Sequence, residues 1–263
     1  MLTGNVTQTI LFGDLFDKPL VALFDRSHAS SDGGAVLLAA ADRRLGLLDR
    51  LAACLEDRRQ PGKIRHDLQS LLAQRVHALA CGYPDGNDAA QLAADPVLKL
   101  LAGHDPVGEE LLASQPTLSR FENAVGPREL FRMAEALADT VIERHRRRRK
   151  GRARRITVDL DITDDPTHGA QQLTFFNGFY DTWCYLPLVG LTATAYLLFQ
   201  EIRFHARRTT LARAQVATLR DMLLKLGAEV ERSVRRFVVH LPATAPYRDV
   251  WQRIAIGLGA QAG

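Results

Sequence analysis

VDLDITDDPTHGAQQLTFFNGFYDTWCYLPL, residues 158–188, is the stretch that decides the fold. Around its start the residues alternate, with Ile156, Val158, Leu160 and Ile162 on one side and Thr157, Asp159, Asp161 and Thr163 on the other. This period of two predicts a strand with one buried face. The continuation LTFFNGFYDTWCYLPLVGL predicts two aromatic-rich strands with a turn near Tyr180–Thr182. We therefore expect a small β-segment with two carboxylates on one polar face.

The two strand carboxylates are candidate metal ligands. Asp is unfavourable in strands unless its side chain has a role there. Asp161, with Asp159 two residues earlier, is therefore either a metal ligand or a solvated strand residue. Phosphoryl transfer on DNA uses carboxylates to hold two divalent ions roughly 3.5–4 Å apart. The loop beyond carries Asp164, Asp165 and His168, which we interpret as turn residues before and after Pro166.

A basic run precedes this strand. RHRRRRKGRARR, residues 144–155, has nine Lys or Arg in twelve positions, although the net charge of the whole chain is only +4. Such a run is either a solvated helix end or a polyanion site. We interpret it as a DNA contact made by Arg146, Arg147, Arg148, Arg149 and Lys150.

The residues before the basic run are predicted to be helical. Apolar spacing over 33–80 fits two amphipathic helices separated by the turn RRQPGK, and Asn87 or Asp88 is a candidate cap of a further helix. Over 108–145 we expect a short helix, a Ser-Gln-Pro-Thr turn, a second helix capped by Thr117 and a long third helix. This is either an ordinary helical hairpin or a helix-turn-helix. In the second interpretation Thr117, Ser119 and Arg120 contact phosphates or base edges.

Beyond residue 193 we expect two helices with a stop at Gly227, a last strand in VRRFVVHLP and a closing helix in APYRDVWQRIAIGLGA.

The chain has 263 residues, of which 46% are hydrophobic, and it lacks an apolar run long enough for a membrane span. It also shows no export signal, so we expect a cytoplasmic, nucleoid-associated protein. Three scattered cysteines argue against a disulfide framework or a zinc site built from them.

Three segments resemble one family. VDLDITDDPTHGAQQLTFFNGFYDTWCYLPL (158–188) resembles the opening strands of the DDE transposases of bacterial insertion sequences, in the subgroup called DDE domain group 1. LLASQPTLSRFENAV (111–125) is similar to that subgroup's N-terminal region. The stretch from Thr194 to Pro242 is similar to its C-terminal end. The resemblance implies an Asp, Asp, Glu triad with Mg²⁺, in which Asp161 is the first member and Asp159 the alternative.

The resemblance also implies the domain organisation. We expect an α+β or α/β chain with a helical DNA-binding region over 1–143, a basic linker over 144–155 and a ribonuclease-H-like catalytic domain over 156–263. The family's long segment with the second Asp and the Glu is missing, and CYLPLVGL runs directly into TATAYLLFQEIRFH. The deletion junction lies near 189–194. Glu201 and Asp181 are the carboxylates that could substitute, but we expect Glu201 to pair with Arg203 or His205 or face solvent, and Asp181 to shape a turn.

The family resemblance and the missing segment give two principal hypotheses. The first is an inactive, internally deleted transposase that still binds DNA, with the terminal inverted repeats of its element as the partner. The alternative is a DNA-binding regulator or inhibitor that forms mixed oligomers with intact transposase; a homo-oligomer is also compatible with the sequence. A working transposase is the least favoured, because one metal ligand cannot assemble a two-metal site.

Overall fold

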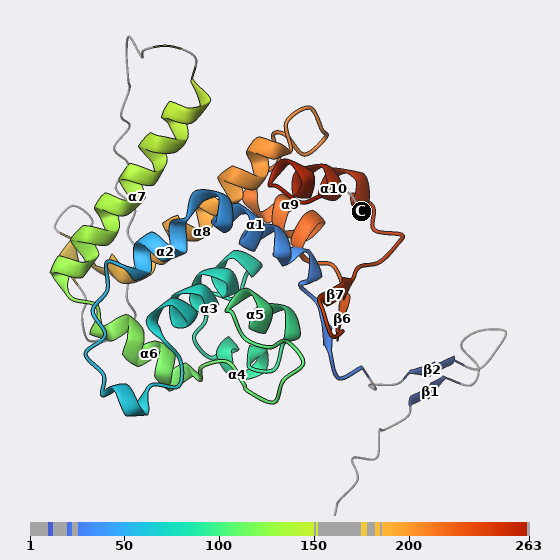
Figure 1. The fold of residues 1–263 in the computed structure, drawn as a ribbon, viewed down its shortest axis with the longest axis horizontal. Coiled ribbons are helices and arrows are strands. Elements are labelled where there is room, and N and C mark those ends of the chain that lie inside the picture. Colours follow the sequence, from blue (N-terminus) through green and yellow to red (C-terminus); the bar gives the residue numbers. More distant parts are fainter. Residues whose placement is uncertain are drawn as a thin grey trace, which may run out of the picture.

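The computed structural model of the chain describes residues 10–12, 20–22, 26–149, 151, 175–177, 182–184 and 186–261. Helices and small antiparallel sheets make up these residues, which is compatible with an α+β fold (Figure 1). Asp159, Asp161 and Lys150 lie outside the described residues, as does the strand expected over 156–163. Within the described ranges, no helix combines enough length with enough apolar character to cross a membrane.

The helices dominate the described chain. In order they are η1 (Gly33–Ala35), α1 (Val36–Leu45), α2 (Leu47–Ala52), η2 (Pro61–Lys63), α3 (Leu68–Cys81), α4 (Asp88–Leu92), α5 (Pro96–Leu101), α6 (Gln115–Ala124), α7 (Pro127–Arg148), α8 (Leu186–His205), α9 (Val216–Leu219), the π-helical η3 (Arg220–Leu224) and α10 (Arg248–Gly257). The long helix expected before the basic run is α7, which also contains the first five residues of that run, Arg144–Arg148.

Short polar side chains and glycines set the helix boundaries in the first half. Asp67 and Asp95 each accept a backbone N–H of the following turn, at 2.7 and 2.9 Å, and so begin α3 and α5. Gly46, with φ of 62°, separates α1 from α2, and Gly82, with φ of 91°, ends α3. The two helices predicted over 33–80 are therefore present, but the first is divided at Gly46. Asn87 precedes α4 as expected, although its side chain makes no capping hydrogen bond.

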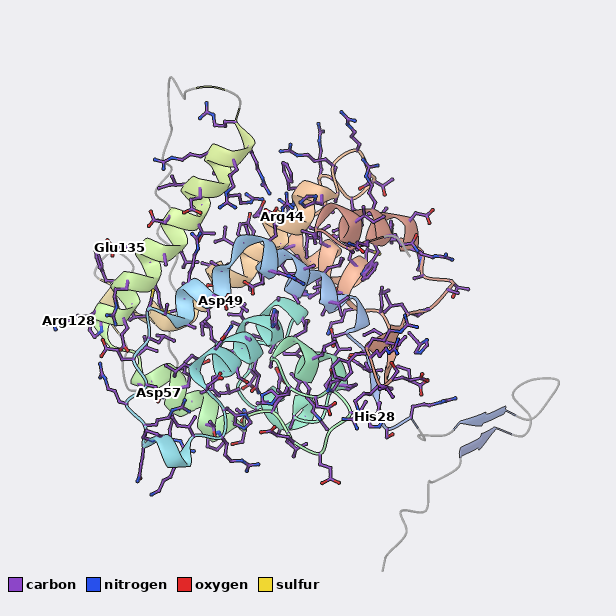
Figure 2. The ribbon with its side chains drawn as sticks, in the orientation of Figure 1. His28, Arg44, Asp49, Asp57, Arg128 and Glu135 are labelled. Atoms are coloured by element: carbon purple, nitrogen blue, oxygen red, sulfur yellow. The ribbon has the colours of Figure 1, made fainter. Side chains whose placement is uncertain are left out.

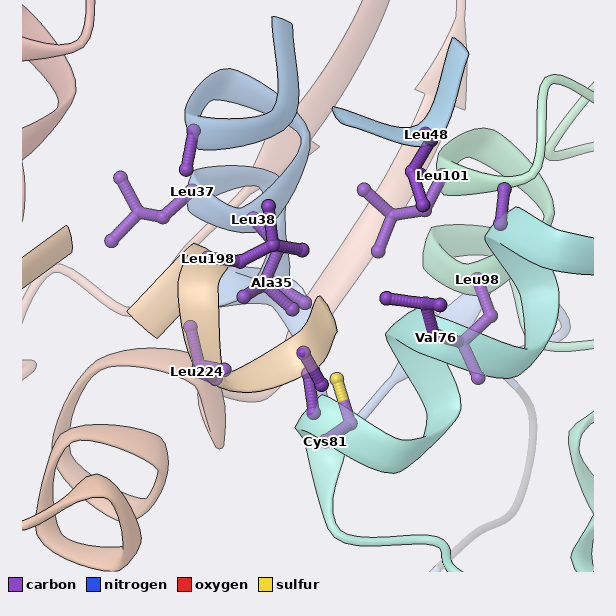
Figure 3. Close-up of a cluster of buried hydrophobic side chains, with 14 of the residues drawn as sticks. Ala35, Leu37, Leu38, Leu48, Val76, Cys81, Leu98, Leu101, Leu198 and Leu224 are labelled. Carbon is purple, nitrogen blue, oxygen red and sulfur yellow. The ribbon is translucent and has the colours of Figure 1, made fainter. Parts of the chain in front are cut away.

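One hydrophobic core joins the two large described parts of the chain. α3 packs against α8, and α8 also packs against α1 and α7. Figure 3 shows buried side chains of α1, α3, α5 and α8 meeting at this point, including Leu38, Val76, Leu98 and Leu198. Residues from both sides of the predicted linker 144–155 thus share a core, and the domain boundaries there stay a prediction. Cys54 and Cys81 are free, as expected.

A three-stranded antiparallel sheet connects the two long described segments, 26–149 and 186–261. Its order is β3 (Ala29–Ser30), β6 (Ala228–Arg232) and β7 (Phe237–His240). Ala29 pairs with Glu229 and Ser30 with Ala228, whereas β6 and β7 form a hairpin from Glu229–His240 to Arg232–Phe237. The predicted last strand and closing helix are confirmed as β7 and α10. β6 was not predicted from the sequence, because its partner β3 lies about two hundred residues earlier.

Two short hairpins complete the described strands. β1 (Ile10–Phe12) pairs with β2 (Leu20–Ala22), and β4 (Phe175–Asn177) pairs with β5 (Thr182–Cys184). The expected aromatic hairpin is confirmed by β4 and β5, in which Phe175 is opposite Cys184. The expectation that LPLVGL continues the second strand is wrong, because α8 begins at Leu186.

Gly34 marks the closest approach between η1 and η3, and it supports a stability prediction. A Cβ atom at this position would lie 1.8 Å from the carbonyl oxygen of Leu223. Backbone cannot yield as a flexible side chain can, so we expect Gly34→Ala to lower the free energy of unfolding by at least about 2 kcal/mol. Urea denaturation measures this loss. Gly62→Ala is the control, since a Cβ there meets nothing within 4 Å, and an equal loss in both variants would contradict the packing described.

Candidate nucleic-acid interface

A groove of about 840 Å³ runs between α6 and the loop that links α2 to α3. The loop contributes residues 55–60 with Lys63, Arg65 and His66, and α6 contributes Thr117, Arg120, Phe121 and Ala124. Figure 2 shows Asp57 where this loop leaves the helical body. Since α6 carries the residues that the sequence proposed for DNA contact, the groove is the natural place to examine that proposal.

The floor of the groove is apolar. Leu71, Leu112 and Phe121 line it and are buried, at 1%, 4% and 7% exposure. α6 packs on α3 and α4, and Leu118 and Phe121 are its two buried residues. The same packing that holds α6 in place therefore leaves one side of its first turns open to the groove.

Asp57 and Glu129, two of the four carboxylates that line the groove, have partners within the chain. Arg59 donates to both oxygens of Asp57, at 2.7 and 2.5 Å, and this contact lowers the pKa of Asp57. Glu129 accepts backbone N–H groups of Gly126 at 2.7 Å and Glu56 at 2.9 Å. Burial alone would raise the pKa of Glu129, but these hydrogen bonds outweigh it and the pKa lies below its ordinary value. Both groups are ionised and satisfied at neutral pH, and neither needs a cation from a ligand.

The cations of the groove are turned outward. Lys63, Arg65 and Arg120 line it, are exposed, and form no ion pair with any residue that the structure describes. Arg58 is also exposed, at 68% of its side chain, and lies 3.7 Å from Glu56. The lining holds five cations (Arg58, Arg59, Lys63, Arg65 and Arg120) against three exposed carboxylates (Glu56, Asp57 and Glu109), and Glu129 is buried. The rim above the apolar floor is therefore net positive. Such a rim suits the phosphate backbone of a nucleic acid.

The structure corrects the expected start of the candidate recognition helix. α6 begins at Gln115 with Ser114 as N-cap, so the expectation that Thr117 caps it is wrong; Thr117 lies in the first turn, and its hydroxyl is 3.2 Å from that of Ser114. The short helix expected just before it is absent, since 108–114 is irregular. Thr117 and Arg120 line the groove, whereas Ser119 does not and accepts a hydrogen bond from Asn123.

Two residues, Val125 and Gly126, separate α6 from α7. The connection is therefore a tight turn, and its use as a helix-turn-helix stays a prediction.

The basic run divides into exposed and internal residues. Arg146, Arg147 and Arg149 are exposed at the end of α7, and Arg147 also lies 3.4 Å from Glu143. Arg148 instead lies over the ring of Phe204, 3.5 Å from its centroid. Its guanidinium also binds Glu201 of α8, so its charge is already matched inside the protein.

Glu201 is the best-connected charge in the described structure. Its side chain is 2% exposed; Oε1 lies 3.3 Å from Arg44 Nε and 3.4 Å from His205 Nε2, and Oε2 accepts from Arg144 Nε at 2.8 Å. Burial would raise its pKa, but the hydrogen bond from Arg144 and the charge of Arg148 outweigh burial and lower it. The expected pairing with His205 is confirmed. The expectation that Glu201 faces solvent is wrong, because its side chain is buried. The expectation that it pairs with Arg203 is also wrong, because Arg203 donates to the carbonyl of Ala214.

The remaining predicted site residues, Asp159, Asp161 and Lys150, lie outside the described residues. Conversely, Arg58, Lys63 and Arg65 are not among the site residues predicted from the sequence, because they lie in or next to the turn expected between two helices. The signal was present: RRQPGKIR, residues 58–65, holds four cations in eight positions around a Pro-Gly pair.

Comparisons with known proteins relate the chain to one protein family. A family model described as transposase DDE domain group 1 matches residues 12–191 and, in a second segment, residues 189–260. Together the two segments cover most of the chain. The search of curated proteins and the search of solved structures give no match.

Proposed function

The chain belongs to the transposase DDE domain group 1 family, and on that premise we propose that it is a DNA-binding relic of a bacterial insertion-sequence transposase that no longer cuts DNA. Its family supports a function in DNA transposition and recombination. The observation that carries the DNA-binding part is the rim of Lys63, Arg65 and Arg120 beside α6. We expect the protein on the bacterial nucleoid, bound at the terminal inverted repeats of its element.

An internal deletion in the catalytic domain is the reason that we expect no cleavage. The two segments matched by the family model meet at residues 189–191. In the structure one helix, α8, runs from Leu186 to His205 through this point, and a single residue separates it from β5. Parallel strands of a ribonuclease-H-like sheet need crossover connections of about a dozen residues. No room exists here for a further strand and helix bearing the second Asp and the Glu.

Glu201 does not fit the role of a substitute Mg²⁺ ligand. Mg²⁺ requires free carboxylate oxygens and near-octahedral geometry. Both oxygens of Glu201 already face cations, with Arg44 at one and Arg144 and Arg148 at the other. The position of Asp161 lies outside the described residues, so a role for Asp161 as one ligand of an incomplete site stays a proposal.

Strand cleavage tests this proposal. The purified chain is incubated with a labelled duplex taken from the DNA flanking its gene, with Mg²⁺ or Mn²⁺, and samples are run on native and denaturing gels. We expect a shifted but intact duplex, with Asp161→Ala indistinguishable from the wild type. A nicking endonuclease added to a parallel sample confirms that the duplex can be cut. Nicking by the wild type that disappears in Asp161→Ala would contradict the proposal.

A further inference from the structure

Two histidines and a glutamate from separate segments converge at the margin of the groove. His66 precedes α3, while His104 and Glu110 lie in the loop after α5. Their ligand atoms all lie within 4.8 Å of one another. The imidazole rings of His66 and His104 are 5.5 Å apart between centroids, at an interplanar angle of 67°.

The contacts of His104 match those of a metal ligand. Its Nδ1 lies 3.5 Å from Glu110 Oε2, which is long for a hydrogen bond. Two ligands of a tetrahedral Zn²⁺ with bonds of about 2.1 Å are themselves separated by about 3.4 Å. The other ring nitrogen, Nε2, lies 2.8 Å from the hydroxyl of Ser70. A ligand histidine usually has such a partner on its second nitrogen, which fixes the tautomer that leaves the first nitrogen free to bind.

His66 supplies an independent observation. Its side chain is 8% exposed, and its buried Nδ1 has no hydrogen-bond partner. Leaving a buried imidazole nitrogen unpaired is unfavourable unless something binds it.

We propose that His66, His104 and Glu110 bind a Zn²⁺ ion. Two imidazoles and one carboxylate form a ligand set that Zn²⁺ accepts, whereas Mg²⁺ and Ca²⁺ take oxygen ligands. Three protein ligands leave a fourth coordination position for water or an anion. The set uses no cysteine. Because the ligand atoms now lie within 4.8 Å of one another, binding a tetrahedral ion would draw them closer by at most about 1.4 Å.

An ion at this position would have a structural and an electrostatic effect. It would join the segment before α3 to the loop after α5. Since His66 also lines the groove, the ion would add two positive charges at the groove margin. The site depends on side chains alone and stands whether or not the groove binds DNA.

Zinc titration of the metal-free full-length chain tests the site. The chain is dialysed against a chelator and titrated with Zn²⁺ by calorimetry, and Co²⁺ titration then reports ligand geometry by visible absorption. We expect one tight Zn²⁺ per chain, lost in the double variant His66→Ala and His104→Ala. Glu110→Gln is expected to weaken binding by at least about tenfold. Because Glu110 is exposed, this variant leaves the fold intact.

Glu109→Gln is the matched control, since Glu109 is the adjacent exposed glutamate and is not a ligand. It should bind Zn²⁺ as the wild type does. Equal affinity of Glu110→Gln and Glu109→Gln would overturn the assignment, as would stoichiometric Zn²⁺ binding that persists in the double histidine variant. No Zn²⁺ binding by the wild type would overturn it as well.

Discussion

Replacing Glu201 with alanine is expected to lower the free energy of unfolding by about 3–5 kcal/mol, because it removes the buried carboxylate and leaves the partly buried Arg144 and Arg148 without their counter-charge. Arg144 loses the acceptor of its 2.8 Å hydrogen bond, and Arg148 loses the carboxylate that holds it over Phe204. The contact between α7 and α8 depends on these two arginines. Urea denaturation followed by far-UV circular dichroism measures the loss.

Glu143→Ala is the matched control for this variant. Glu143 lies on the same helix as Arg144 and also pairs with two arginines, Arg50 at 2.9 Å and Arg147 at 3.4 Å, but its side chain is 41% exposed. Exposed ion pairs contribute little to the free energy of unfolding. The Glu143→Ala variant should therefore lose only a small fraction of the free energy of unfolding that the Glu201→Ala variant loses. Equal losses would show that the buried cluster does not hold the helices together.

The Glu201 contribution should also depend on pH. Because its pKa is lowered in the folded state, its ionised form stabilises the protein fully above the ordinary pKa of a glutamate. That stabilisation is lost as the pH falls through the lowered folded value. The difference in stability between the wild type and Glu201→Gln should thus be full at pH 7 and shrink in acid.

The second large effect concerns DNA affinity. We expect the triple variant Lys63→Ala, Arg65→Ala and Arg120→Ala to bind duplex DNA more weakly by two to three orders of magnitude at about 0.1 M salt, since each phosphate contact contributes nearly one order there. All three side chains line the groove and are exposed, so the fold should not change. Fluorescence anisotropy of a labelled duplex measures the affinity.

A charge-matched control separates the groove from the overall charge. Arg235, Arg248 and Arg253 are also exposed, and the last two lie on α10, far from α6 in Figure 1. Their triple alanine variant has the same net charge as the groove variant. We expect it to retain most of the wild-type affinity. An equal fall in both variants would mean that the chain attracts DNA by total charge and not through the groove.

Local features of the fold could be predicted from the sequence, and long-range ones could not. The helix starts at Asp67 and Asp95 and the ends at Gly46 and Gly82 follow from the chemistry of single residues. β6 depends on pairing with β3, from the opposite end of the chain, and no local pattern reports such a partner.

The same limit applies to the candidate sites. The partners of Glu201 come from α1, α7 and α8, and only His205, one helical turn away, lay within reach of a spacing argument. His66 and His104 are likewise brought together by the packing of loops and not by a motif. Of the groove cations, the sequence predicts Arg120 as a DNA contact but indicates only a turn for RRQPGKIR, residues 58–65, because a charge run alone does not show which way its side chains face.

The salt dependence of DNA binding tests the central claim most directly. For the wild type, the logarithm of the affinity should fall linearly as the logarithm of the NaCl concentration rises, and the slope should become shallower by about 3 in the groove variant. The α10 and Arg235 control should keep the wild-type slope. Identical slopes in the wild type and the groove variant, or wild-type binding that does not respond to salt, would contradict the account that this transposase relative holds DNA phosphates in the groove beside α6.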